Sequence, residues 1–330
     1  MVEETHYANL YDRAREYAAQ LKTKYGPCKA VCESTGNLWI RTADAFEKEG
    51  IPIQLSNPFK TALIAKASVK TDKVDARALA SLLRSDMLST CYIGTAGERD
   101  TRQLFRYQMG MVKGRTVVIN ATHALLDKYD VDPRKGGKTV WRPKTLAYLD
   151  GVQLTGPVDQ FVLEGYLSRI RHCNEEIAKA NEKIKEYGKS SDAVKLLLSL
   201  MGIDIFAAAL VAAEIGDIRR LASARSMVSW AGMCPTIHQS GDSMYHGRMK
   251  KDSNRRVNWI MIQCAFTAVR YDPRMTAYYE RIKKRHPPQV AITHVARKML
   301  TIIWTMLTRN EAYESRDKRR HADKLKKLMG

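Results

Sequence analysis

Two long amphipathic helical patterns occupy the middle of the chain, between about residues 97 and 190. They read GERDTRQLFRYQMGMVKGRTVVINATHALLDKY and GYLSRIRHCNEEIAKANEKIKEYG, and the polar, proline-containing segment DPRKGGKTVWRP separates them. Two long helices joined by such a break favour a helical hairpin or coiled-coil arm. The heptads are irregular, so the arm is as consistent with a spacer as with an oligomerisation element.

The residues before this arm alternate short apolar runs with helical patterns. Residues 29–32 and 51–55 are apolar runs bounded by turn signals, which predicts two buried strands. Helices are expected over residues 4–24, 38–49 and 73–88. Strands and helices in alternation favour an α/β sheet for a first domain, residues 1–96.

The chain after the arm, residues 191–314, is predicted to form a mainly α-helical domain. Its first part, AVKLLLSLMGIDIFAAALVAAEIG, places a turn at Gly202 between two helices. This pattern fits a helix-hairpin-helix whose turn amides meet a DNA phosphate, and equally a packed αα-hairpin without DNA contact. Further helices are expected over residues 256–270 and 288–308, and residues 315–330 form a basic tail, helical or disordered.

The charge of the chain indicates a polyanionic partner. Lysine and arginine number 55 against 35 acidic residues, a formal net charge of +20. Nucleic acid is favoured over an acidic membrane surface, because no amphipathic anchor or lipidation signal is present. No apolar run reaches the length of a membrane span, so a cytoplasmic protein is expected. The six cysteines are scattered without zinc-type spacing and are expected to be reduced.

Two aspartates three residues apart open the helix expected at residues 73–88. Acids at a helix start commonly cap free N–H groups and complement the macrodipole, which suits Asp72 and Asp75. Residues at this spacing also project from one helical face, where they could share a hard cation. Glu33, at the end of the first predicted strand, is a third candidate ligand. The spacing alone leaves capping and metal binding both open.

The amino-acid sequence of several segments resembles that of the DEDD transposases of the IS110 insertion-sequence family, which are recombinases guided by a bridge RNA. The similar segments span most of residues 29–308 in the family's order. They are Glu33-Ser34-Thr35-Gly36, Ser56-Asn57-Pro58, Lys70 to Ala80, Met201-Gly202-Ile203, Ala213 to Asp217, Trp230 to Pro235, Gln239-Ser240-Gly241 and His294 to Lys298. The resemblance implies a RuvC-like, RNase H-like first domain and a C-terminal transposase domain.

The resemblance also implies roles for individual residues. Glu33, Asp72 and Asp75 would be three of four acids that hold Mg²⁺. Ser240, in Gln-Ser-Gly, would attack a DNA phosphodiester and form a transient phosphoserine link, with Ser243 as a competing serine. Six basic residues would contact nucleic acid: Arg77, Arg248, Lys250, Lys251, Arg255 and Arg256. The implied assembly is a tetramer with a structured noncoding guide RNA and DNA.

One departure from the family pattern concerns the first acid. In the family it lies on an N-terminal strand in a Gly-Ile-Asp type sequence, whereas the residues before Glu33 read as a helix. Asp12 lies within that helical pattern and is not expected to replace it. We therefore expect an N-terminally incomplete RuvC-like domain. A catalytically impaired, nucleic-acid-binding relic and a Holliday-junction-type nuclease remain as alternatives.

Overall fold

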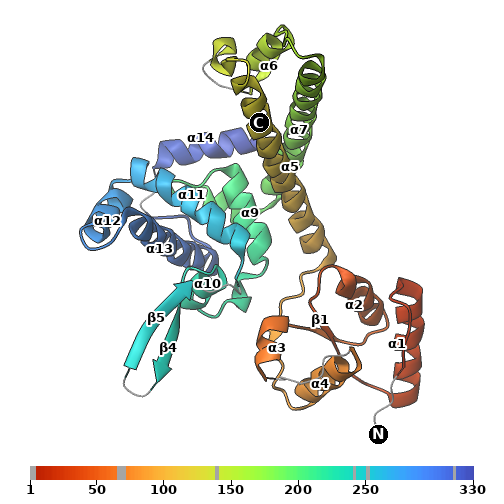
Figure 1. Ribbon diagram of the computed structural model, residues 1–330. Coiled ribbons are helices and arrows are strands. Elements are labelled where there is room, and N and C mark those ends of the chain that lie inside the picture. Colours follow the sequence, from red (N-terminus) through yellow and green to blue (C-terminus); the bar gives the residue numbers. More distant parts are fainter. Residues whose placement is uncertain (1–4, 65–71, 138–140, 241–242, 250–252, 315–316) are drawn as a thin grey trace. The chain divides into compact units, whose positions relative to one another are not determined.

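The computed structural model describes residues 5–64, 72–137, 141–240, 243–249, 253–314 and 317–330. The chain divides into two compact units, Met1–Thr95 and Ala96–Gly330. The first contains the small sheet, and the second contains both long helices and the helices that follow them (Figure 1). The arm and the C-terminal helices thus belong to one compact unit, and the finer division predicted from the sequence stays a prediction.

The first unit is a three-stranded mixed sheet with helices. Its elements are α1 (Tyr11–Tyr25), β1 (Ala30–Glu33), α2 (Leu38–Lys48), β2 (Ile53–Ser56), α3 (Pro58–Ile64), α4 (Asp72–Arg84) and β3 (Thr90–Cys91). The strand order is β1-β2-β3, with β1 parallel and β3 antiparallel to β2. Ala18, Phe46 and Ile51 form its buried apolar cluster. The strand–helix alternation predicted from the sequence is therefore present.

One local prediction in this unit was wrong, and one element was not anticipated. The first helix was predicted to begin at residue 4 but begins at Tyr11. Tyr7 lies before the helix, and its ring packs with its centroid 5.0 Å from that of Tyr17. Asn57-Pro58 follows the end of β2 at Ser56 and also starts α3, a helix that was not predicted. The Asn57 side chain accepts a hydrogen bond from the Lys60 amide at 3.2 Å, and proline is favourable at a first helical position.

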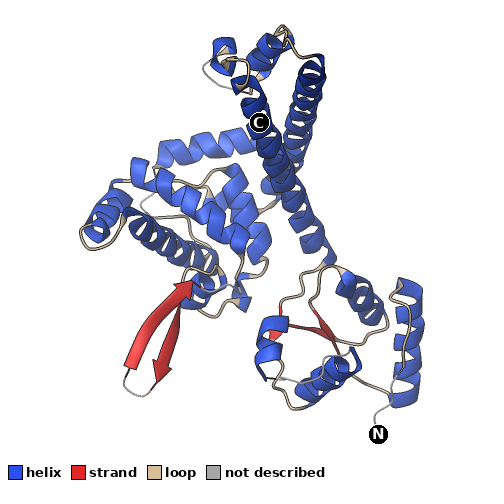
Figure 2. Ribbon diagram, viewed as in Figure 1, coloured by secondary structure: helices blue, strands red, loops and turns tan. Residues whose placement is uncertain are grey.

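The second unit begins with the predicted helical hairpin. α5 (Ala96–Asp127) and α7 (Pro157–Ser190) lie side by side (Figures 1 and 2). A 3₁₀ turn, η1 (Pro133–Gly136), and a short helix, α6 (Pro143–Asp150), lie between them at the far end. This end has its own apolar cluster, which includes Leu126, Leu149, Leu163 and Ile170. It is therefore a packed tip and not an open loop.

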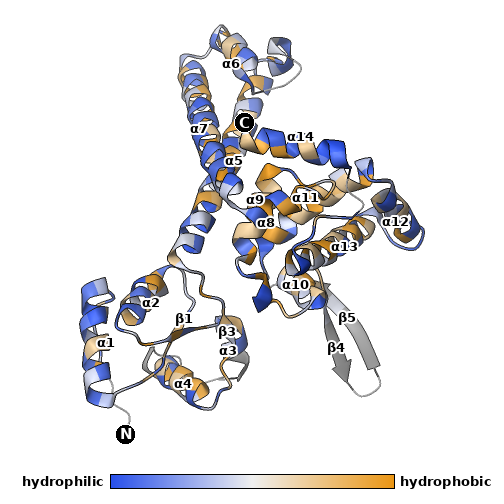
Figure 3. Ribbon diagram, turned by 180° about the vertical axis from the view of Figure 1, so that it is seen from behind, coloured by the Kyte–Doolittle hydropathy of each residue, from blue (hydrophilic) through white to orange (hydrophobic). Residues whose placement is uncertain are grey.

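The remaining helices form the main core of the second unit. They are α8 (Asp192–Leu197), α9 (Ile205–Ile215), the 3₁₀ turn η2 (Ile218–Arg220), α10 (Ala224–Trp230), α11 (Arg255–Tyr271), α12 (Pro273–Lys283), α13 (Pro288–Arg309) and α14 (Lys318–Met329). Hydrophobic stretches gather on α9, α11 and α13 (Figure 3). α13 is long and apolar enough to cross a membrane, but 44% of its most apolar window is buried against the other helices.

Two elements of this unit differ from the sequence-based expectation. The polar segment after α10, for which no strand was predicted, forms a hairpin of β4 (Pro235–Ser240) and β5 (Ser243–Met249). α12 was not anticipated either. The basic tail, for which helix and disorder were both open, is helical, and its Leu328 is fully buried in the main core.

The turn at Gly202 packs against protein, as in a closed αα-hairpin. Gly202 has a φ of +88°, and a Cβ added to it would lie 2.5 Å from the backbone oxygen of Cys264 in α11. Asp204 caps α9 by accepting a hydrogen bond from the Ala207 amide at 2.7 Å. Both observations favour the packed hairpin over a helix-hairpin-helix, because one amide of the helix start is already satisfied and the turn is pressed against a helix.

Candidate active site

Glu33 lies at the carboxyl end of β1, as predicted. The strand is held parallel to β2 with Glu33 opposite Ser56, and the next amide, of Ser34, donates to the Ser56 carbonyl at 3.2 Å. The Glu33 side chain is exposed, and its Oε1 accepts a hydrogen bond from the Thr35 hydroxyl at 2.7 Å. The chain then turns through Gly36 at a φ of +55°. Sheet and turn together fix where this carboxylate is presented.

Asp75 and Glu33 line the same hollow of the first unit. Asp75 is part-exposed in the first turn of α4, and the hollow between α4 and the edge strand β1 has a volume of about 990 Å³. Leu79 and Leu83 of α4 line it further along the helix. Two acids that are 42 positions apart in the chain thus face one cavity with an apolar wall. Asp72 is the first residue of α4, but its side chain lies outside the described residues.

The donors in this hollow suit a hard divalent cation in part. Magnesium typically takes one or two protein carboxylates and completes its shell with water and phosphate oxygens, which two acids can satisfy. Cys32 also lines the hollow, but burial raises the pKa of its thiol to about 11, so it stays protonated at neutral pH. Among the residues described, no group of three or more histidine, cysteine or acidic side chains is close enough to hold a metal.

The candidate serines lie at the end of the β4–β5 hairpin. Ser240 is the last residue of β4 and Ser243 the first of β5, and the antiparallel register pairs them. Their side chains lie outside the described part of the chain, so the choice between them stays a prediction. The hairpin backbone, however, places both serines beside the connection between the two strands.

The predicted basic residues are distributed over both units. Arg77 is exposed on α4, and Arg255 and Arg256 form the first turn of α11. Lys250, Lys251 and the Arg248 side chain lie outside the described residues. Arg256 is 41% exposed in its side chain, and its Nη1 is 4.0 Å from Glu214 Oε1. Its guanidinium therefore lies next to a buried carboxylate, in addition to any contact with nucleic acid.

Glu214 lies in a family-like segment of the sequence but was assigned no role there. It lies near the end of the otherwise apolar helix α9 and is only 6% exposed. Its Oε2 accepts a hydrogen bond from Asn254 Nδ2 at 2.7 Å. Asn254 in turn caps α11, because its Oδ1 accepts hydrogen bonds from the backbone amides of Arg256 and Val257. The backbone amide of Asn254 donates to the Trp230 carbonyl. A single acid in an apolar helix was the available signal.

Comparison with known proteins identifies the family. The model of the Transposase IS116/IS110/IS902 family matches residues 194–280, and a second IS110-type model, of DEDD transposases, matches residues 2–130. The chain is 28% identical to the "Transposase for insertion sequence element IS1111A" of Coxiella burnetii, covering 93% of this chain and 84% of that protein.

A second relative is similar over the same extent. It is the "Probable family 20 transposase" of Pseudomonas aeruginosa, which is 24% identical over 91% of this chain and 89% of its own length. Both family models and both relatives are thus described as transposases. The chain belongs to the IS110 family of DEDD transposases.

Proposed function

We propose that this chain is an RNA-guided, Mg²⁺-dependent DNA recombinase that uses Ser240 as its nucleophile and holds the cation with Glu33, Asp72 and Asp75. Membership of a DEDD transposase family implies a RuvC-like first domain, DNA as a partner and a divalent cation. The observation that carries the residue assignment is the shared hollow of Glu33 and Asp75. A tetramer with a structured guide RNA is part of the proposal.

The proposed reaction is a transesterification at a DNA phosphodiester. The Ser240 oxygen bonds to phosphorus and loses its proton, while the bond from phosphorus to one sugar oxygen breaks and that oxygen takes up a proton. The product is a phosphoserine ester, which a DNA hydroxyl reverses on rejoining. A bound divalent cation would supply charge stabilisation at the phosphate oxygens. Glu33 and Asp75 would hold that cation through carboxylate oxygens, and Arg255 would offer positive charge to flanking phosphates.

The test is strand cleavage and joining by the purified chain with element ends, transcribed candidate RNA and Mg²⁺. Glu33→Gln and Asp75→Asn are expected to lose more than the roughly 10–100-fold that outer-shell metal partners contribute. Asp12→Asn is the matched control, because Asp12 is an exposed acid of the same unit that does not line the hollow. If the control loses as much activity as the two variants, the metal-ligand assignment is wrong.

The serine and RNA assignments are tested in the same assay. Ser240→Ala is expected to abolish both joining and the covalent protein–DNA product on denaturing gels, while Ser243→Ala retains them. Full joining by Ser240→Ala would refute the nucleophile, and continued nicking without joining would favour a junction nuclease. Equal activity with and without RNA would refute the guide. Mass photometry of the assembled complex tests the tetramer.

A further inference from the structure

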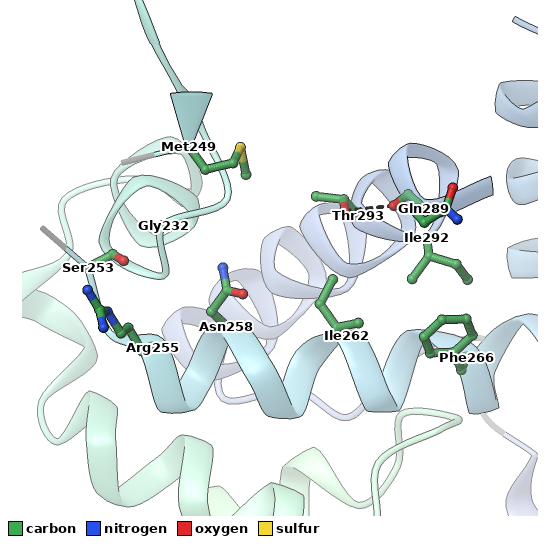
Figure 4. Close-up of a pocket in the computed structure, with 10 residues that line it drawn as sticks. All are labelled: Gly232, Met249, Ser253, Arg255, Asn258, Ile262, Phe266, Gln289, Ile292 and Thr293. Atoms are coloured by element: carbon green, nitrogen blue, oxygen red, sulfur yellow. Dashed lines mark hydrogen bonds between the residues drawn. The ribbon is translucent and has the colours of Figure 1, made fainter. Parts of the chain in front are cut away.

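A groove on the second unit runs along one face of α11. Its α11 wall is made by Arg255, Asn258, Ile262 and Phe266, which follow one another at helical spacing (Figure 4). The start of α13 forms the opposite wall with Gln289, Ile292 and Thr293, and the groove has a volume of about 510 Å³. At about 1.5 Å per residue, the α11 wall is about 16 Å long. We call this the α11 groove.

The aromatic residues of α11 leave flat apolar surface in solvent. Phe266, in the groove, is 55% exposed, and Trp259, two turns before it on the same side of α11 but outside the groove lining, is 48% exposed. Full burial of such a side chain is worth about 1.5–3 kcal/mol, so a ligand that covers it gains free energy. Ile262 and Ile292 add apolar surface on the two walls (Figure 4). This chemistry suits a flat, apolar-faced group held between the walls.

The charge around the groove indicates what carries that group. Arg255 lies at one end of the α11 wall, and the exposed Arg270 lies one turn beyond Phe266 at the other. No acidic side chain is found among the described residues that line the groove. A partner with negative charge at repeated intervals and flat rings between the charges is therefore complementary, whereas an apolar protein helix would leave the arginines without counter-charge.

We propose that the α11 groove binds unpaired nucleotides of a single-stranded nucleic acid, with a base stacked on Phe266 and phosphates near Arg255 and Arg270. Bases in a duplex cover one another's faces, so only an unpaired or extruded base can reach an aromatic ring in a groove. The volume suits a base or two, since it lies within the range of small-ligand pockets. The inference rests on the proposed nucleic-acid function and adds to it the strandedness of the bound segment.

Met249 connects this groove to the predicted nucleophile. It ends β5, the strand that begins at Ser243, and its side chain is 42% exposed at the wall of the groove (Figure 4). Ser253, on the same side, precedes the Asn254 cap of α11. A strand held by Phe266 would thus lie along the base of the serine-bearing hairpin, which gives the groove a place in the same reaction.

The test measures binding of labelled 12-nucleotide oligo-dT, oligo-U and duplex DNA to the full chain by fluorescence anisotropy in EDTA. Stacking contributes about 1–3 kcal/mol per base, so Phe266→Ala is expected to raise the single-strand Kd about 5- to 150-fold. Its duplex Kd should stay within about twofold, because phosphate contacts dominate there. Phe266→Trp is expected to retain single-strand binding. Oligo-dT and oligo-U separate DNA from RNA as the source.

The matched control is Phe161→Ala, which removes a 76% exposed phenylalanine from α7 of the same unit, outside the groove. The proposal is overturned if Phe266→Ala binds single strands like the wild type, if single strands and duplex weaken equally, or if Phe161→Ala gives the same loss. Loss of self-association with unchanged oligonucleotide binding would instead make the groove an interface between copies. Binding in EDTA needs neither cation nor Ser240, so these outcomes are independent of the cleavage assay.

Discussion

Replacement of Gly202 by alanine is expected to be one of the most damaging single-methyl changes in the second unit. The residue has a φ of +88°, which costs an L-residue about 1–2 kcal/mol. The new Cβ would also lie 2.5 Å from the Cys264 carbonyl oxygen and 2.9 Å from both the Cβ and the amide nitrogen of Ala268. All three atoms belong to the α11 backbone or its first side-chain carbon, so no flexible side chain can move aside.

The magnitude follows from these two effects. Relief of the contact requires α11 to shift within a close-packed core, and overpacking of this kind costs about 1–3 kcal/mol. Together with the backbone cost, Gly202→Ala should lower the free energy of unfolding by about 3 kcal/mol. At about 2–4 °C per kcal/mol for a unit of this size, the Tm of the second unit falls by about 6–12 °C.

Calorimetry of the full chain measures this shift, with Gly114→Ala as the matched control. Gly114 lies inside α5, and apart from the local backbone of that helix nothing lies within 4 Å of an added Cβ, so alanine should stabilise the helix by about 0.5–1 kcal/mol. Opposite signs for the two glycine-to-alanine changes support the close approach of the turn to α11. The reasoning is wrong if the Tm of Gly202→Ala lies within about 1 °C of the wild-type Tm, since the predicted loss of stability corresponds to a much larger shift.

Two further predictions concern buried groups of the second unit. Glu214→Ala removes a charge-assisted hydrogen bond from Asn254 and should cost about 2–3 kcal/mol in urea unfolding, whereas Glu214→Gln keeps an acceptor oxygen and should cost about 1 kcal/mol; equal losses would contradict the hydrogen bond. Burial raises the pKa of the Cys264 thiol to about 12 in the folded chain, whereas an exposed thiol in the unfolded chain titrates near about 8.5. The unfolded chain therefore loses this proton at a lower pH than the folded chain, and the free energy of unfolding should fall as the pH rises from about 8.5 towards 12. Mass spectrometry after iodoacetamide treatment at about pH 8.5 should find Cys264 unmodified in the native protein and alkylated in urea; rapid native alkylation would contradict its burial.

The long helices of the second unit could be predicted because periodicity accumulates over many turns. α5, with 32 residues, lies within two residues of the expected limits, whereas α7, with 34 residues, ends near the expected position but begins eight residues before the expected pattern, at Pro157. The β4–β5 hairpin could not be predicted in this way. Its strands, PTIHQS and SMYHGRM, are largely polar and lack the apolar alternation of a half-buried strand, so their pairing is decided by backbone hydrogen bonds that leave little trace in composition.

The candidate site also contains residues that a local sequence pattern could indicate and residues that it could not. Glu33 and Asp75 could be proposed because acids at a strand end and a helix start are local patterns, and the structure brings both to one hollow. The contact between Glu214 and Asn254 joins residues 40 positions apart, which no local pattern reports. The role of Ser240 rests on its motif, since a serine hydroxyl carries no distinguishing spacing of its own.

The hairpin of α5 and α7 has a mechanical consequence. Its base is held where Phe105 packs edge-on against Phe206 and Tyr187, with ring centroids 5.7 and 6.3 Å apart, and the distant end has an apolar cluster of its own. At about 1.5 Å per residue, the part of α5 from Phe105 to Asp127 is about 33 Å long, so a tilt of about 10° at the base would carry the tip through about 6 Å. A small change in the packing of Phe105 that tilts the helix would therefore produce a larger displacement at the tip than at the base.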